Sequence, residues 1–269
     1  MEQRLDMNDN YLKVARLAAA AGAEILLSYQ GRFSVREKAP RDLVTEADVA
    51  AQQAIQKILL SNFPDHGFVG EEEGHDQVSA EMLADPNHPP IWIVDPLDGT
   101  VNYVHQLQSF AVSIAMYHRG ELQLGVVHDP VTKEIFWAQR GGGAFLNDCP
   151  IQCSQSDRLD QALLACSFSA GVRHDSGELD RFAAALDQAQ AVRRLGSAAL
   201  NLCYVAAGRL DGYWATCVKP WDVAAGAVIV SESQGEILSL AGEKFDIWDP
   251  RFVATATKSL NDQLRRCLA

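Results

Sequence analysis

Two aspartates three positions apart, Asp95 and Asp98, follow an apolar run within the segment Trp-Ile-Val-Asp-Pro-Leu-Asp-Gly-Thr-Val-Asn at residues 92–102. Residues 91–94 have the length and β-branched content of a short buried strand. Two neighbouring carboxylates repel each other unless a cation lies between them, so the pair indicates a site for a hard metal ion. The amides of Gly99 and Thr100, at the start of the next helix, are suited to hold a phosphate. The segment therefore predicts a phosphoryl-transfer site.

The same residues also have a structural interpretation, because Asp-Pro and Asp-Gly are common turn dipeptides. Two other functional patterns fail on spacing. Haloacid-dehalogenase-type phosphatases have one residue between the aspartates of an Asp-x-Asp-Gly-Thr element, whereas two residues separate Asp95 and Asp98 here. A calcium loop places acidic residues or Asn at alternate positions, and the spacing of Asp95 and Asp98 does not match that pattern either.

Three other segments place acidic side chains at the ends of predicted elements. Glu71 ends the predicted strand at residues 67–70, Asp48 lies in the first turn of a predicted helix, and Asp222 opens a late, apolar helix. Each has a structural alternative. Asp48 lies three residues after Thr45 and would complete a capping box, while the helix macrodipole favours Asp222 without any ligand.

Composition limits the class of protein. The 269 residues are 48% hydrophobic and 22% charged, which is ordinary for a globular chain large enough for one big domain or two intimate halves. The net charge of −12 argues against nonspecific nucleic-acid binding. No segment is predicted to span a membrane and the first residues lack the order of a signal peptide, so together with six scattered cysteines a cytoplasmic location is expected.

The elements that must position these residues follow from periodicity and caps. Asn8, Asp9 and Asn10 offer N-caps to a helix that ends at Gly31. The remaining predictions are helices at residues 45–63, 176–190, 197–208 and 220–232, strands at 67–70, 91–95, 109–118, 122–128, 135–139, 162–167, 192–195 and 211–216, and a turn at 141–148.

This pattern predicts an α+β fold with an antiparallel-rich first half and an α/β second half that share one cleft. The first half, residues 1–150, carries a helix pair, an antiparallel sheet and most of the candidate metal ligands. The second half, residues 151–269, supplies Asp222 and the substrate pocket.

Together these segments resemble the inositol monophosphatase family of magnesium-dependent phosphatases. The matches occur in the family's order, cover roughly residues 10–255, and lie at residues 42–48, 70–72, 92–105, 141–147, 196–199 and 221–226. The resemblance implies the family's layered αβαβα sandwich, two or three Mg²⁺ ions per active site, a small-molecule phosphate ester as substrate and a homodimer, with no nucleic-acid or membrane partner.

The resemblance also implies roles for individual residues. Glu71, Asp95 and the backbone carbonyl of Leu97 would bind the first Mg²⁺, and Asp95, Asp98 and Asp222 the second. Sharing of Asp95 would hold the two ions about 4 Å apart, on either side of an in-line displacement.

Catalytic and substrate-binding roles follow by the same resemblance. Thr100, paired with Asp48 and assisted by Glu71, would orient and deprotonate the attacking water, so no covalent intermediate is needed. Phosphoryl oxygens would lie on the amides of Gly99 and Thr100, beside Asp98. The alcohol pocket would be lined by Gly196, Ser197 and Ala198.

The predicted function is a Mg²⁺-dependent phosphomonoesterase acting on a small polyol or sugar phosphate. Inositol-selective members place a Glu seven residues before the metal-binding Asp of the late helix, and this chain has Ala215 there. A methyl group accepts no hydrogen bond from ring hydroxyls. Fructose 1,6-bisphosphate, histidinol phosphate and nucleotide phosphates therefore remain alternative substrates. A metal-binding regulatory protein with little turnover is the alternative function, which the intact catalytic positions disfavour.

Overall fold

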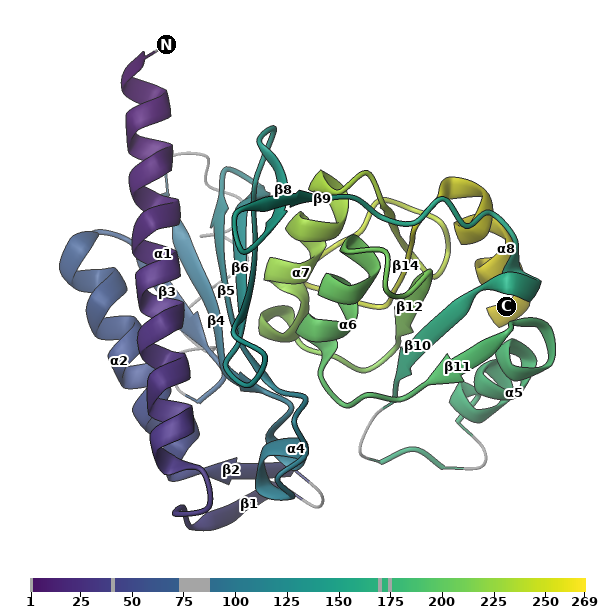
Figure 1. Ribbon diagram of the computed structural model, residues 1–269, viewed down its shortest axis with the longest axis horizontal. Coiled ribbons are helices and arrows are strands. Elements are labelled where there is room, and N and C mark those ends of the chain that lie inside the picture. The colour runs from purple at the N-terminus through teal and green to yellow at the C-terminus, as the bar shows by residue number, and fades with distance from the viewer. Residues whose placement is uncertain (1, 40–41, 73–87, 169–170, 174–175) are drawn as a thin grey trace.

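Two large β-sheets alternate with three layers of helices in the computed structural model, which describes residues 2–39, 42–72, 88–168, 171–173 and 176–269 (Figure 1). A separate antiparallel pair of short strands, β1 and β2, precedes α2. Helices α1 and α2 cover the outer face of a seven-stranded sheet, α6 and α7 lie between the two sheets, and α5 and α8 cover the outer face of a five-stranded sheet. The layered α+β fold expected from the sequence is confirmed.

The helices are α1 (Glu2–Tyr29), α2 (Glu46–Asn62), α4 (Thr100–Val104), α5 (Glu178–Gln188), α6 (Ala198–Ala206), α7 (Pro220–Glu232) and α8 (Lys258–Leu268). The strands are β1 (Val35–Ala39), β2 (Asp42–Thr45), β3 (Gly67–Gly70), β4 (Ile91–Asp98), β5 (Ala111–His118), β6 (Glu121–Asp129), β7 (Glu134–Gln139), β8 (Gly143–Leu146), β9 (Cys149–Ile151), β10 (Leu163–Ser167), β11 (Ala191–Arg193), β12 (Gly212–Ala215), β13 (Glu236–Ser239) and β14 (Phe252–Thr255).

The two large sheets differ in strand direction, as the two predicted halves do. The first runs in the order β3-β4-β5-β6-β7-β8-β9 and is antiparallel except for the parallel pair β3–β4. The second has the order β11-β10-β12-β14-β13, with β10 parallel to both neighbours and β14 antiparallel to both of its own. Because β11, β10 and β12 run in parallel, their carboxyl ends lie at the same edge of this sheet.

Three hydrophobic cores lie between successive layers. The first core joins α1 and α2 to the seven-stranded sheet and includes the fully buried Trp92 and Tyr103. The second encloses α6 and α7 between the sheets, and the third lies under α5 and α8 around Trp214. Because α7 is buried on nearly every side, its apolar sequence follows from its place between two sheets.

Some elements depart from the prediction. Helix α1 begins at Glu2 and continues through the three residues predicted as its caps. Residues 42–45 form strand β2, so α2 begins only at Glu46. Part of the predicted turn at residues 141–148 is strand β8. The predicted strand at residues 91–95 continues to Asp98 through an irregularity in its pairing with β5, so both aspartates lie on β4.

No helix within the described ranges is long and apolar enough to cross a membrane. Strand β9 ends at Ile151, next to the predicted boundary between residues 150 and 151. That division into two halves stays a prediction.

Candidate active site

Glu71 and Asp95 meet because they follow two strands that run in parallel. In the pairing of β3 with β4, Gly70 lies opposite Val94, so the next residues on the two strands are Glu71 and Asp95. The amide of Glu71 donates a hydrogen bond of 3.2 Å to the carbonyl of Val94, which continues the ladder by one residue. Carboxyl ends of parallel strands therefore place both acidic side chains at the same edge of the sheet.

The irregular stretch between Asp95 and Asp98 is held by short contacts. The amide of Leu97 donates to Asp95 Oδ1 at 2.9 Å, in the manner of an Asx turn. Gly99 follows with φ 94°, in the left-handed region that favours glycine, and a Cβ there would lie 2.9 Å from the carbonyl oxygen of Ser109. The turn into α4 therefore requires glycine.

Asp98 joins the first half of the chain to the start of α6. Its carboxylate accepts hydrogen bonds from the Ser197 hydroxyl and from the amides of Ala198 (3.1 Å) and Ala199 (2.8 Å). Ser197 is also the N-cap of α6, because its hydroxyl accepts from the amide of Leu200. The predicted alcohol-pocket segment therefore lies against the predicted metal ligand Asp98.

Asp222 reaches the same place from the first turn of α7. Its Oδ2 accepts from the amide of Lys219 at 2.8 Å, so Asp222 makes a capping contact at the start of α7 that the sequence analysis did not predict. Its side chain also contacts the carboxyl of Asp95, so α7 and β4 meet here.

The negative charges of Glu71, Asp95, Asp98 and Asp222 repel one another in the metal-free protein. The pKa of Asp95 is raised well above its ordinary value, first by burial and then by the negative charges of Glu71, Asp98 and Asp222. Burial raises the pKa of Asp98 to about 6 even though Ser197 and two amides stabilise its charged form. Burial and the charge of Asp98 raise the pKa of Asp222 well above its ordinary value. These carboxylates are therefore held close together at a cost.

A divalent cation with oxygen ligands fits this donor set. Asp95, Asp98 and Asp222 form no ion pair with Lys, Arg or His within the described part of the chain. In that part, no three His, Cys, Asp or Glu side chains stand close enough to enclose a metal as they are. The oxygens of Asp98 and Asp222 instead contact the amides at the starts of α6 and α7. The charge and the hard donors suit Mg²⁺, and the side chains must turn inward to enclose it.

Thr100 and Asp48 lie beside the carboxylates. Asp48 both caps a helix and contacts Thr100, so the structural and the catalytic interpretations of this residue are compatible. Asp48 Oδ2 completes the capping box of α2, accepting from the Thr45 amide at 2.9 Å and hydroxyl at 2.6 Å. Asp48 Oδ1 lies 3.3 Å from the Thr100 hydroxyl, which also reaches the carbonyl of Leu97 at 3.1 Å. Burial raises the pKa of Asp48 to about 6. The cap thus fixes a buried carboxyl against Thr100.

Two buried polar residues that sequence analysis did not single out position this site. Gln52, one turn after Asp48 on α2, accepts from the amide of Glu72 at 3.0 Å. Asn102 Nδ2 donates to the carbonyls of Ser109 and Leu195, both at 2.8 Å, and ties α4 to the segment before α6. Gly196 allows this contact, because a Cβ there would lie 2.6 Å from Asn102 Nδ2. The sequence did offer one sign of this role for Gln52, because it is a polar residue on the buried face of a predicted helix.

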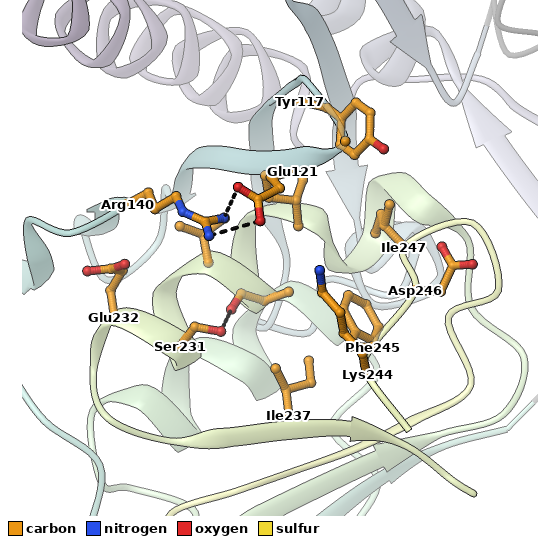
Figure 2. Close-up of a pocket in the computed structure, with 14 residues that line it drawn as sticks. Tyr117, Glu121, Arg140, Ser231, Glu232, Ile237, Lys244, Phe245, Asp246 and Ile247 are labelled. Atoms are coloured by element: carbon orange, nitrogen blue, oxygen red, sulfur yellow. Dashed lines mark hydrogen bonds and ion pairs between the residues drawn. The ribbon is translucent and has the colours of Figure 1, made fainter. Parts of the chain in front are cut away.

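A cavity of about 630 Å³ lies at the opposite end of α7 and contains none of these residues. Figure 2 shows Lys244 and Phe245 on one side of it and the Arg140–Glu121 ion pair on the other. Ser231 and Glu232 of α7 line it, about ten residues along the helix from Asp222, or roughly 15 Å. The carboxylates remain the candidate site, because they are buried and repel one another, whereas the charged side chains at this cavity include the Arg140–Glu121 ion pair.

Comparison with known proteins agrees with the geometry. A family model described as the inositol monophosphatase family matches residues 7–268. The chain is 38% identical to an inositol-1-monophosphatase from Synechocystis sp., over 96% of this chain and 88% of that protein. It is also 38% identical to the Nus factor SuhB of Pseudomonas aeruginosa, over 92% of each.

The fold has close structural neighbours as well. The crystal structure of the extragenic suppressor protein suhB from Bartonella henselae superposes with a TM-score of 0.86, at 33% identity over 95% of this chain and 97% of that one. Both the sequence and the fold match over nearly the whole length. The chain belongs to the inositol monophosphatase family and is a phosphoric monoester hydrolase.

Proposed function

We propose that the chain is a Mg²⁺-dependent phosphomonoesterase that hydrolyses a small polyol or sugar phosphate with water as the nucleophile. The observation that carries this proposal is the meeting of Glu71, Asp95, Asp98 and Asp222, from four segments, beside the Thr100–Asp48 pair. The relative named as an inositol-1-monophosphatase supports the substrate class.

The residues that would hold two or three Mg²⁺ ions are Glu71, Asp95, Asp98 and Asp222 with the carbonyl of Leu97. When bound, the cations neutralise charge that develops on the phosphoryl oxygens. The chain's own part is to fix these oxygens: the Leu97 amide holds Asp95, and the start of α6 holds Asp98. Gly99 and Thr100 would present their amides to the phosphoryl group.

Proton transfer falls to Thr100 and Asp48. A hydroxyl has one donor and two acceptor lone pairs. When Thr100 donates to Asp48, its oxygen accepts the proton of the attacking water while its own proton passes to the carboxylate. The water oxygen bonds to phosphorus and the ester P–O bond breaks. The leaving alkoxide takes a proton from a solvent water, Asp48 returns its proton to solvent through Thr100, and the alcohol leaves through the pocket beside Gly196, Ser197 and Ala198.

A phosphate-release screen tests the proposal. Purified protein with Mg²⁺ is assayed against inositol, sugar, polyol, histidinol and nucleotide phosphates and fructose 1,6-bisphosphate, with and without chelator. We expect chelator-sensitive release from polyol and sugar monophosphates. Preference for nucleotide phosphates or the bisphosphate would redirect the substrate class, and release that survives chelation would overturn the metal assignment.

A regulatory role with little turnover is the second candidate. The similarity to a protein named Nus factor SuhB favours it. The two candidates separate cleanly if Mg²⁺ binding is measured by calorimetry beside the screen, because a regulator would bind the ion and release no phosphate from any ester.

We also propose a homodimer, a division of the chain into residues 1–150 and 151–269, and a cytoplasmic location. Family membership supports the dimer, which sedimentation equilibrium tests. The two sheets support the division, since the first holds β3 to β9 and the second holds strands from β10 onward. All six cysteines are free thiols, which supports a reducing compartment.

A further inference from the structure

We propose that the cavity at the C-terminal end of α7 binds a small organic monoanion with an aromatic or branched aliphatic body. Its volume of about 630 Å³ falls within the range of roughly 300–1,000 Å³ that is typical of small-molecule sites. None of the residues at the candidate reaction centre is among its lining residues. The site therefore goes beyond the proposed phosphatase activity and does not depend on it.

Three parts of the fold surround this cavity (Figure 2). They are one face of α7, the hairpin of β5 and β6 with the end of β7, and the segment from β13 to residue 247. The apolar lining packs on the core between the two sheets and includes Tyr117, Leu122, Val228, Ile237, Phe245 and Ile247. An apolar ligand thus has walls to contact that the fold already holds in place.

Lys244 brings a positive charge to these walls. It forms no ion pair in the part of the chain that the structure describes. The loop that carries it is closed by a hydrogen bond of 3.0 Å from the amide of Ser239 to the carbonyl of Glu243. Figure 2 shows the Lys244 side chain extending from this loop into the cavity. An anion in the cavity would therefore meet an ammonium group that is free to pair with it.

The acidic side chains at the cavity already have partners of their own. Both oxygens of Glu121 contact Arg140, at 3.0 and 2.9 Å. The two oxygens of Glu232 accept from backbone amides of the glycine turn after β7, at 2.8 and 3.0 Å. Asp246 accepts from a backbone amide two residues further on, at 2.9 Å. Figure 2 shows Glu232 and Asp246 at opposite margins of the cavity, away from the Lys244 amine.

This distribution of charge selects a ligand with a single negative charge. The carboxylate or sulfonate of a monoanion would accept a charge-assisted hydrogen bond from Lys244, while its apolar body covers the walls. A phosphate ester with two negative charges would be repelled by the acidic side chains around the one unpaired cation. A polyol would leave its hydroxyls against apolar side chains. The cavity and the reaction centre therefore take different classes of molecule.

The test titrates two fluorescent compounds of the same shape into the purified protein. Anilinonaphthalene sulfonate is an aromatic monoanion whose fluorescence rises in apolar surroundings, and phenylnaphthylamine has the same rings without the charge. Mg²⁺ and inorganic phosphate are present so that the proposed reaction centre is occupied. We expect saturable binding of one sulfonate per chain and weaker binding of the uncharged compound.

Lys244→Met keeps the apolar stem of the side chain and removes its charge. We expect the Kd of the sulfonate to rise about tenfold and the Kd of phenylnaphthylamine to stay within about twofold. Lys258→Met is the matched control, because Lys258 is an exposed lysine at the start of α8 that does not line the cavity, and it should change neither value.

A second variant blocks the cavity by volume. Ser231 is exposed on the face of α7 that lines the cavity, and its hydroxyl bonds only to the carbonyl of Ala227 one turn earlier in the same helix. Ser231→Phe should therefore preserve the fold and abolish binding of both compounds. The Tm of each variant is measured as well, because partly unfolded protein also binds the sulfonate.

An unchanged sulfonate Kd in folded Lys244→Met, or full sulfonate binding in folded Ser231→Phe, would overturn the inference. So would an equal loss of both compounds in Lys244→Met, because the charge would then not be what is recognised. Failure of the proposed function looks different: the unmodified protein would release no phosphate from any ester, while binding of the sulfonate and its response to Lys244→Met would persist.

Discussion

The two aspartates on β4 are held in different ways, and the difference predicts their sensitivity to substitution. Asp98 accepts three hydrogen bonds from the start of α6, whereas Asp95 accepts one from a backbone amide, that of Leu97, and faces three other acidic side chains. Asp98 therefore has a structural role beside its proposed metal-binding role. Asp95 has little structural reason to be an acid, because its charge is buried and repelled.

Asp95→Asn should abolish Mg²⁺-dependent turnover and should also raise the Tm of the metal-free protein. Removing a buried, repelled charge relieves a cost in the free protein, while the proposed shared ligand is lost. Phosphate release and thermal unfolding in chelator are the two measurements. Full turnover in a folded Asp95→Asn protein would remove the metal assignment.

Thr100→Ala should lower kcat about a hundredfold and change KM little. The lost hydroxyl acts on the attacking water, and general base assistance contributes roughly 10²–10⁴-fold. Thr100→Ser, which keeps the hydroxyl, should retain most of the rate. Steady-state kinetics of both variants at saturating Mg²⁺ provide the check. Equal losses in the alanine and serine variants would show that the threonine methyl matters instead.

The pH dependence of kcat should reflect Asp48. Burial raises the pKa of this carboxyl from 3.8 to about 6, and only the ionised form accepts a proton from Thr100. As pH falls the carboxylate becomes protonated, so kcat should fall on the acid side. Burial places this fall above the ordinary pKa of 3.8, and bound Mg²⁺, which favours the ionised form, keeps it at or below about 6. The profile is measured between pH 4 and 9 at saturating Mg²⁺. Asp48→Asn should lose this dependence and leave a low residual rate.

An aromatic cluster joins α1, α2 and the first sheet away from the reaction centre. The ring of His66 stacks on Phe63 with centroids 4.9 Å apart, and lies 5.4 Å from Tyr11 and 5.9 Å from Trp92. Burial, with repulsion from His118, lowers the pKa of His66 from 6.5 to about 4. The folded protein thus keeps a neutral imidazole where the unfolded chain would be protonated.

Stability should therefore decline as pH falls from about 6.5 towards 4. Above pH 6.5 the His66 imidazole is neutral in both the folded and the unfolded state. Between pH 6.5 and 4 it is protonated in the unfolded state but stays mostly neutral in the folded state, which favours unfolding. Allowing for partial exposure, the loss at pH 5 is about 1 kcal/mol. His66→Phe should remove this loss in urea unfolding with chelator at pH 7.5 and 5. The same pH difference in both proteins would exclude His66 as its source.

Local sequence signals predicted the elements with clear ends. Helix α7 matches its predicted bounds because Pro220 starts it at N1 and an apolar run fills it, and Ser197 marked the start of α6. Strands β1, β13 and β14 were not predicted, because they are short and form only by pairing with neighbouring strands. The contact of Asp98 with Ser197 joins residues 99 positions apart. No spacing rule gives such a contact; it emerges only when the layers pack.

The layered arrangement assembles the site, because α7 carries Asp222 from the second half to the carboxylates of the first. Small residues allow this helix to approach both neighbours. A Cβ on Gly125 of β6 would lie 2.4 Å from the carbonyl oxygen of Ala225, and a Cβ on Gly226 would lie 2.5 Å from Leu202 of α6. The depth at which α7 lies between the sheets thus sets the position of Asp222 relative to Asp95.

Gly125→Ala should therefore weaken Mg²⁺ activation as well as stability. The added methyl would clash with the backbone of Ala225, which cannot move aside as a side chain can by changing rotamer. Helix α7 must therefore move away from β6, which lowers the free energy of unfolding by about 1–3 kcal/mol. Asp222 moves with its helix, and we expect the Mg²⁺ concentration for half-maximal phosphate release to rise severalfold. Gly171→Ala, where an added Cβ meets nothing within 4 Å, is the matched control and should change neither quantity. A Gly125→Ala protein with a lower Tm but an unchanged Mg²⁺ requirement would show that the position of α7 does not govern the metal site.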